Sequence, residues 1–330
     1  MKDLVLKVND KCNFKCDFCS SNKIAENHDD LDINVVKEYL KKERVSNIIL
    51  NGGDPLLVNV DYYWDLLDFI TTNNMDTRIS FTTNLLEFKK NPIKWSTLFC
   101  HPLVDVCTSF QYGSGRKLAT GEVYTEEMFV EIYNLFKKLV NKDLPFIAVV
   151  TEENEQYCMD TVKLAQKLGT VCRLNGCLKS GRAVEMFPYY KMLSIYLDII
   201  EAGLGDYENN CWIIQKVWKY HQTDECPYNT NCRESLACIS PNGTIHSCPS
   251  IADDIFMKDI HPGFLEENSV AKLPFEMSVL KAECPMCPMT CFCNSCYKRI
   301  QDIKDTSVSV HCKKMKALQA RCIKVMGEPG

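Results

Sequence analysis

The chain has 330 residues, enough for a large hydrophobic core, and its 46% hydrophobic and 25% charged content is ordinary for a globular protein. The net charge of −5 argues against a general polyanion binder, so no nucleic-acid binding is indicated. No run approaches the roughly 20 apolar residues of a membrane span, and Asp3, Asn9 and Asp10 do not suit a signal peptide. The 20 cysteines therefore predict metal ligands in a reducing cytoplasm.

From residue 1 to about 185, β-rich apolar runs alternate with helical patterns. The predicted strands are Leu4–Val8, Asn47–Leu50, Arg78–Thr82, Val104–Phe110, Pro145–Val150 and Val171–Leu174. The predicted helices are Asn34–Glu43, Asp61–Thr72, Glu126–Val140 and Gln156–Leu168. This alternation predicts an α/β fold with a parallel sheet and right-handed crossovers. In parallel α/β folds, functional residues lie at the C-terminal ends of the strands.

Three cysteines follow the first predicted strand at CxxxCxxC spacing: Cys12, Cys16 and Cys19, with Phe18 before the last. Three thiolates can hold three irons of a [4Fe–4S] cluster and leave the fourth iron open to another ligand. A zinc knuckle is the alternative, and it would need a fourth ligand.

Polar or glycine-rich segments follow other predicted strands. After the second strand, Gly52 and Gly53 would let the backbone approach a ligand closely, Asp54 follows, and Pro55 fixes the exit of the turn. On the fourth strand, Ser109 and Gln111 alternate with Phe110, so both are predicted to point into the barrel mouth, although ordinary strand-end polarity would look the same. The glycine-rich segment 112–124 is either a substrate loop or a plain connection.

The remainder of the chain divides into a helical bridge (186–225) and a cysteine-rich segment (226–330). The bridge holds two predicted helices, around Met192–Ile200 and Trp212–Tyr220. In the cysteine-rich segment, Ile239–Cys248 is predicted to form a β-hairpin, because Asn242 and Gly243 are a strong turn signal between two extended runs.

The cysteine triplet resembles the signature of the radical S-adenosylmethionine (SAM) superfamily, and Gly52–Pro55 resembles its GGEP motif with Asp54 in place of glutamate. The resemblance implies a partial (β/α)6 TIM-type barrel over 1–185. It also implies that SAM chelates the open iron and that reductive cleavage of SAM yields methionine and a 5′-deoxyadenosyl radical. The implied SAM-contacting residues are Phe18, Gly52, Gly53, Asp54, Pro55, Ser109, Gln111, Arg173 and Asn175, with Arg182 as a further basic residue.

The cysteine-rich segment resembles the SPASM extension of this superfamily, which holds two auxiliary [4Fe–4S] clusters. By position, the resemblance implies Cys232, Cys238, Cys248 and Cys296 as ligands of the first cluster. It implies Cys284, Cys287, Cys293 and Cys312 as ligands of the second. Cys226 and Cys291 compete for these roles, and two structural zinc sites are the alternative. Clusters with four protein ligands would serve electron transfer.

The leading functional interpretation is modification of a ribosomally made peptide or protein by cross-linking, epimerisation or oxidation, with a flavodoxin or ferredoxin as electron donor. The sequence begins directly at the first strand, so we expect no leader-binding domain, which weighs against a peptide substrate. A radical dehydrogenase or epimerase of an aminocyclitol, sugar or nucleoside is the alternative, and an electron carrier or iron–sulfur scaffold is a third. Cys177 follows the sixth strand and is a candidate hydrogen-atom donor, although a packing role also suits it.

Overall fold

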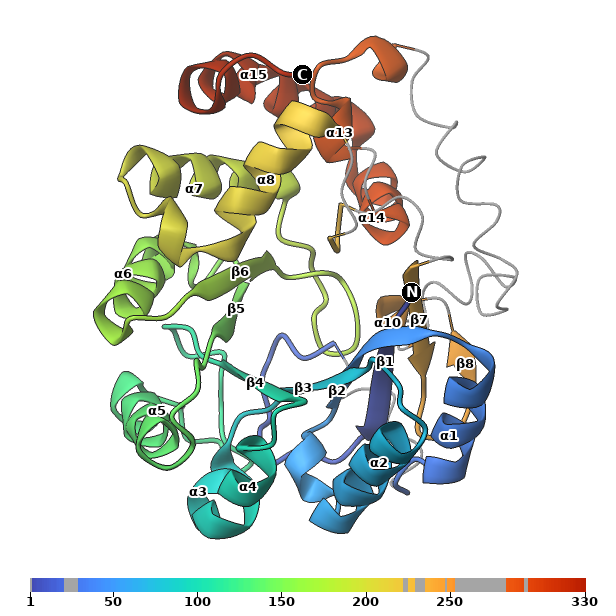
Figure 1. Cartoon of the computed structure of the whole chain (residues 1–330). Helices are drawn as coiled ribbons and strands as arrows, with labels where there is room; N and C mark the ends of the chain where they lie inside the picture. The colour runs from blue at the N-terminus through green and yellow to red at the C-terminus, as the bar shows by residue number, and fades with distance from the viewer. Residues whose placement is uncertain are drawn as a thin grey trace.

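The strands of the protein form one continuous sheet. The computed structural model describes residues 2–20, 29–221, 225–228, 235–246, 248–252, 283–293 and 296–330. Its strands are β1 (Lys2–Asn9), β2 (Val45–Gly52), β3 (Arg78–Thr82), β4 (Val104–Ser109), β5 (Phe146–Val150), β6 (Cys172–Gly176), β7 (Leu236–Ile239) and β8 (Ile245–His246). They form an eight-stranded sheet in the order β6-β5-β4-β3-β2-β1-β7-β8. Strands β1 to β6 are parallel and adjacent in chain order, which confirms the predicted parallel sheet (Figure 1).

Helices cover the outer face of this curved sheet (Figure 1). The barrel helices are α1 (Ile33–Lys42), α2 (Val60–Thr72), α3 (Leu86–Lys90), α4 (Pro92–Phe99), α5 (Glu126–Val140) and α6 (Cys158–Leu168), with short 3-10 turns η1 (Pro55–Leu57) and η2 (Glu155–Tyr157). Helix α5 and strand β3 have the predicted bounds. The sequence analysis missed α3 and α4, because a five-residue helix followed at once by a proline-initiated one gives little helical periodicity.

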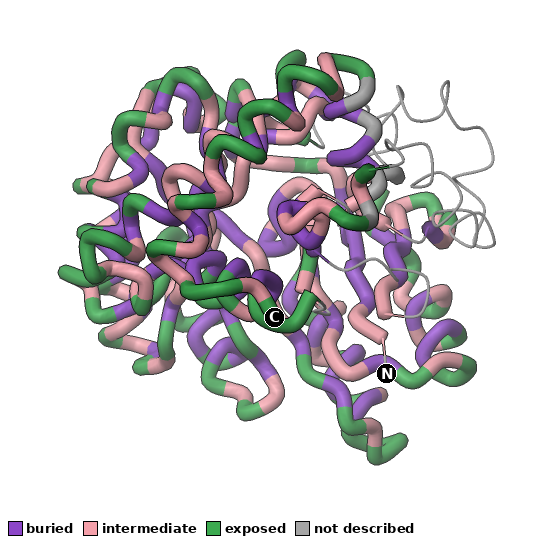
Figure 2. The backbone as a smooth tube through the Cα atoms, turned by 90° about the horizontal axis from the view of Figure 1, so that it is seen from above, coloured by how far each residue is buried: buried purple, intermediate pink, exposed green. Residues whose placement is uncertain are grey.

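The core lies between the sheet and these helices, with buried residues inside and exposed ones around the rim (Figure 2). Aromatic rings fill much of it: the centroids of Phe81 and Phe99 are 5.4 Å apart, and those of Phe99 and Phe136 are 5.9 Å apart. Burying each such side chain contributes about 1.5–3 kcal/mol to the free energy of folding. The strands that carry the functional loops are therefore held in place by a well-packed core.

The predicted hairpin is present, and it belongs to the same sheet. Strands β7 and β8 pair antiparallel, with Gly243 in the turn at φ +80°. Strand β7 also pairs in parallel with β1, from Asp3↔Leu236 to Leu6↔Ile239, which the sequence analysis did not predict. The hairpin that carries Cys238 therefore lies directly beside the strand that leads to the cysteine triplet.

Most of the remaining helices pack at the β6 end of the sheet (Figure 1). They are α7 (Tyr189–Glu201), α8 (Asn209–Tyr220), α13 (Thr290–Cys293), α14 (Tyr297–Thr306) and α15 (Val308–Met326). The short helix α10 (Pro249–Ala252) instead lies beside β7 and β8, at the opposite end of the sheet. Phe292 of α13 stacks on Trp218 of α8 at a centroid distance of 5.7 Å. Arg321 of α15 pairs with Asp198 and Glu201 of α7. In the described part of the chain, no helix is both long and apolar enough to span a membrane.

Candidate active site

The cysteine triplet lies on the loop after β1, and the segment after β4 clamps it from one side. The backbone N–H of Lys15 donates to the carbonyl of Lys117 at 2.8 Å, and that of Asp17 donates to the carbonyl of Gly115 at 2.9 Å. A salt bridge of 2.6 Å joins Lys117 to Asp17. The segment 112–124, which the sequence left open between a substrate loop and a plain connection, therefore holds the cysteine loop in place.

The loop after β6 closes the other side of the triplet. The N–H of Arg182 donates to the carbonyl of Cys19 at 2.9 Å. Gly181 has φ +58°, and a Cβ there would lie 2.2 Å from the carbonyl oxygen of Ser20. Glycine is therefore required at this contact, and the end of the triplet is fixed by residues about 160 positions away in sequence.

The Gly-Gly turn after β2 packs against the chain that enters the cysteine loop. The N–H of Gly53 donates to the carbonyl of Asn9 at 2.8 Å, and that of Asp54 donates to the carbonyl of Lys11 at 2.7 Å. A Cβ on Gly53 would lie 1.8 Å from the Lys11 oxygen, and one on Gly52 would lie 2.4 Å from the Asn9 oxygen. These glycines thus permit a close approach between two loops of the protein, and the predicted contact of this turn with a ligand stays a prediction.

Asp54 ties this turn to the end of β3. Its carboxylate accepts hydrogen bonds from the N–H of Leu56 at 2.9 Å, the hydroxyl of Thr83 at 3.0 Å and the N–H of Asn84 at 2.9 Å. Burial raises the pKa of Asp54 to about 6, against which these hydrogen bonds act. The amide of Asn84 lies 4.0 Å from the sulfur of Cys12, so the network reaches the first cysteine.

Arg116, in the segment 112–124, is a residue of the site that the sequence analysis did not assign. Its buried guanidinium donates to the side-chain oxygen of Gln111 at 2.6 Å and to the hydroxyl of Ser109 at 2.9 Å, and it lies 5.2 Å from the ring centroid of Phe18. The contacts of Ser109 and Gln111 are therefore with Arg116, which in turn interacts electrostatically with the Cys16 thiol. The sequence feature that could have assigned Arg116 to the site is its position as a lone arginine in a glycine-rich segment after a predicted strand.

The environment of the triplet suits thiolates only when a cation is present. Burial, and then the charge of Asp54, raises the pKa of Cys12 to about 12. Burial also raises the pKa of Cys16, with Arg116 acting in the opposite direction. Buried thiols such as Cys12 and Cys16, which resist ionisation, match a site whose ligands lose their protons to bound iron, because a metal reverses the local preference for the neutral form.

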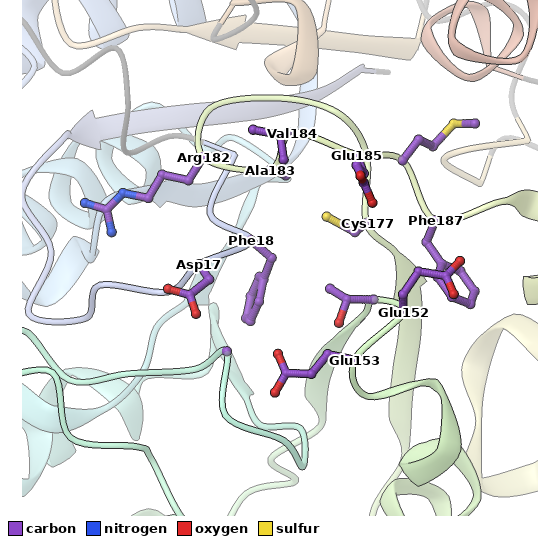
Figure 3. A pocket seen from close by; sticks show the side chains of 13 residues that line it. Asp17, Phe18, Glu152, Glu153, Cys177, Arg182, Ala183, Val184, Glu185 and Phe187 are labelled. Atoms are coloured by element: carbon purple, nitrogen blue, oxygen red, sulfur yellow. The ribbon is translucent and has the colours of Figure 1, made fainter. Parts of the chain in front are cut away.

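Two adjoining cavities open beside the triplet, and both are lined by Phe18 and Cys177. The smaller, of about 230 Å³, is shown in Figure 3 and has the acidic side chains of Asp17, Glu152, Glu153 and Glu185 in its wall, together with Arg182. The larger, of about 360 Å³, contains Arg173 and Asn175 of β6 and reaches Tyr228, Lys298 and Arg299. The structure thus brings together the triplet, the end of β6 and the C-terminal region.

The ligands proposed for the second auxiliary cluster line one further cavity of about 40 Å³. Its wall includes Cys284, Cys287, Cys293 and Cys312, but not Cys291. The four sulfurs predicted as ligands of this cluster therefore lie around one cavity, with Cys293 rather than Cys291 in its wall. Four thiolates of this kind can hold a [4Fe–4S] cluster or a structural zinc ion, so the identity of the metal stays a prediction.

The other proposed cluster is only partly described. Cys232 lies outside the described residues. Electrostatic interactions link Cys238 with Cys248, and link Cys226 with both Cys248 and Cys296. Cys226 therefore remains a competitor for a ligand position. The buried Lys7 of β1 donates to the carbonyl of Pro249 at 3.1 Å and also interacts with Cys238, Cys248 and Cys19, so it lies between the triplet and these cysteines.

A scan against protein families matches the radical SAM superfamily over residues 6–165, a range that contains the whole triplet and the Gly52–Pro55 turn. The chain belongs to the radical SAM superfamily. It is therefore a radical SAM enzyme, and a SAM-binding [4Fe–4S] cluster and SAM are its cofactors. No curated protein sequence matches this radical SAM chain significantly.

Solved structures confirm the fold of this radical SAM enzyme over its full length. anSMEcpe with bound AdoMet has a TM-score of 0.74 at 16% identity, covering 99% of this chain and 98% of that one. anSMEcpe with AdoMet and Cp18Cys peptide has a TM-score of 0.71 at 17% identity, covering 98% of each chain. Streptococcus suis SuiB bound to precursor peptide SuiA has a TM-score of 0.64 at 15% identity, covering 90% of this chain and 72% of that one.

Proposed function

We propose that this radical SAM enzyme abstracts a hydrogen atom from a ribosomally made peptide or protein and thereby cross-links, epimerises or oxidises it. In the proposal, Cys12, Cys16 and Cys19 hold the SAM-binding [4Fe–4S] cluster. When bound, this cluster supplies the electron that cleaves SAM to methionine and a 5′-deoxyadenosyl radical. The protein's own part is to position SAM and substrate beside the cluster and to limit access of water.

Several residues are proposed to bind SAM around that cluster. The backbone of the Gly52–Pro55 turn would contact its amino group, while Arg173 and Asn175 line the larger cavity next to the triplet. Phe18 borders both cavities, so its ring would lie between SAM and the substrate. Ser109 and Gln111 would act on SAM chiefly through Arg116, which both of them contact.

One observation carries the peptide assignment: two cavities share a wall beside the triplet. Together they fall within the range of about 300–1,000 Å³ typical of ligand sites, and they continue from the barrel mouth to the C-terminal helices. A trough of this kind suits an extended chain whose reacting residue lies near Phe18. In keeping with this, anSMEcpe and SuiB, which share the fold, have been solved with a peptide and a precursor peptide bound.

The experiment is anaerobic incubation of the reconstituted enzyme with SAM, a reductant and short peptides encoded beside its gene. Mass spectrometry and chiral amino-acid analysis should show loss of hydrogen or an inverted residue in one peptide. Unchanged peptides, with turnover of an aminocyclitol, sugar or nucleoside instead, would reject the peptide assignment in favour of the small-molecule alternative.

We also propose two auxiliary [4Fe–4S] clusters that take an electron from the substrate radical, and a flavodoxin or ferredoxin as the electron donor for SAM cleavage. Cys284, Cys287, Cys293 and Cys312 would hold one, supported by the cavity that all four line. Cys232, Cys238, Cys248 and Cys296 would hold the other, with Cys226 as the competing ligand. The reconstituted chain should then contain about twelve irons, four for each cubane. About four irons with bound zinc would contradict the auxiliary clusters.

Among the proposed modifications, radical epimerisation is favoured by the position and protonation of Cys177. Its buried side chain lies on the wall shared by the two cavities (Figure 3), and burial raises its pKa to about 11. The thiol is therefore protonated at neutral pH, which is the form that donates a hydrogen atom to a carbon radical.

The variant Cys177→Ala separates cleavage of SAM from hydrogen-atom donation to the substrate radical. If Cys177 is the donor, the variant should still release 5′-deoxyadenosine while forming at least about tenfold less epimerised product, because only the donation step is lost. The buried Cys158→Ala on α6 is the matched control and should leave both products unchanged. Normal epimerised product from Cys177→Ala would remove Cys177 from the reaction.

A further inference from the structure

The larger cavity contains a buried arginine whose hydrogen-bonding capacity is not filled. Arg299 is 7% exposed, and its Nη1 atom is buried without a hydrogen-bond partner. Its guanidinium stacks 4.1 Å from the ring centroid of Tyr189 and lies 5.8 Å from that of Tyr228. The two tyrosines hydrogen-bond to each other at 2.9 Å, so the arginine rests on a fixed aromatic support.

The charge of this cavity is one-sided. Arg173, Lys298 and Arg299 line it, and the described residues in its wall include no acidic side chain. The adjoining smaller cavity carries four acidic side chains, so an anion entering the trough is repelled at that end and attracted at the other.

A buried guanidinium with an unpaired nitrogen costs free energy unless a ligand completes it. We infer that the part of the larger cavity lined by Arg299 is a carboxylate-binding subsite, in which Arg299 holds an acidic group of the substrate while the reacting carbon lies beside Phe18 and Cys177. Arg173 and Asn175, which line the same cavity, are left to SAM. The planar fork of arginine matches a carboxylate with two parallel hydrogen bonds. The carboxylate comes from an acidic side chain or from the C-terminus of a peptide. This inference rests on the proposed function, since it names a property of that substrate.

The test measures binding of three small probes to the SAM-loaded enzyme by ligand-observed NMR, without reductant and therefore without turnover. N-acetyl-L-aspartate methylamide carries a side-chain carboxylate, N-acetyl-L-alanine carries a terminal one, and N-acetyl-L-alanine methylamide is neutral. The reconstituted wild-type enzyme should bind at least one acidic probe about tenfold or more tightly than the neutral probe, and the preferred one identifies the source of the carboxylate. Equal binding of all three would overturn the inference even if no variant folds.

Arg299→Gln should lose the preference for the acidic probe, while Arg299→Lys should keep part of it because the charge remains. Arg78→Gln is the matched control, since Arg78 is exposed and pairs with Asp105 on the surface. Loss of about four irons in Arg299→Gln would overturn the inference, because Arg299 would then serve a cluster near Cys296. Absence of 5′-deoxyadenosine from the wild type would instead refute the proposed function, whatever the probes show.

Discussion

Replacing Cys16 by alanine should abolish SAM cleavage. Cys16 is the middle residue of the triplet, and the segment after β4 and the loop after β6 hold the chain on either side of it. Without its thiolate, the SAM-binding cluster lacks one of three protein ligands. We expect iron to fall from about twelve to about eight per chain and release of 5′-deoxyadenosine to fall at least ~100-fold.

Cys100→Ala is the control for this variant. Cys100 is exposed at the end of α4, far from the triplet in sequence, and should retain full iron and activity. Iron analysis and chromatographic measurement of 5′-deoxyadenosine compare the two variants. A Cys16→Ala enzyme that keeps its iron and cleaves SAM at the wild-type rate would show that these cysteines do not hold the catalytic cluster.

Replacing Gly53 by alanine should destabilise the site by about 3 kcal/mol or more. The added Cβ would lie 1.8 Å from the carbonyl oxygen of Lys11, which is backbone and moves only if the entry to the cysteine loop moves. We expect the denaturant midpoint to fall and the SAM-binding cluster to be lost, because the same displacement pulls the triplet away from its clamps. Chemical denaturation and iron analysis measure both effects.

Gly121→Ala is the matched control for steric contact. Gly121 has φ +92° but no atom within 4 Å of an added Cβ, so alanine there meets only backbone strain of about 1–2 kcal/mol. If Gly53→Ala proves no less stable than Gly121→Ala and keeps its clusters, then the packing of the turn against residues 9–11 does not hold the site together.

Local patterns were sufficient to predict the sheet and the triplet. The alternation of apolar strands and amphipathic helices fixes the order of β1 to β6, and the cysteine spacing needs only one loop. Contacts between distant segments were not predictable in this way. The pairing of β7 with β1 joins two strand edges, and no local sequence pattern indicates which edges will pair. The backbone hydrogen bonds that Gly115 and Lys117 make with the cysteine loop could be made by any residues, so the sequence does not indicate them either.

The same distinction applies to individual residues of the site. Asp54 was found because it lies in a recognisable turn, whereas its hydrogen bonds to Thr83 and Asn84 appear only when β2 and β3 are placed side by side. Arg116 and Arg299 were not assigned because a single arginine in sequence gives no sign of burial. Both are buried in the structure. Arg299 lines the larger cavity, and Arg116 lies against Phe18, which lines both cavities.

The central claim is that the triplet on the clamped loop after β1 cleaves SAM. The most direct measurement is the release of 5′-deoxyadenosine by the anaerobically reconstituted wild-type enzyme given SAM and a strong reductant. The account predicts release that depends on both SAM and reductant. Iron-loaded protein that binds SAM and accepts electrons yet releases no 5′-deoxyadenosine would contradict it.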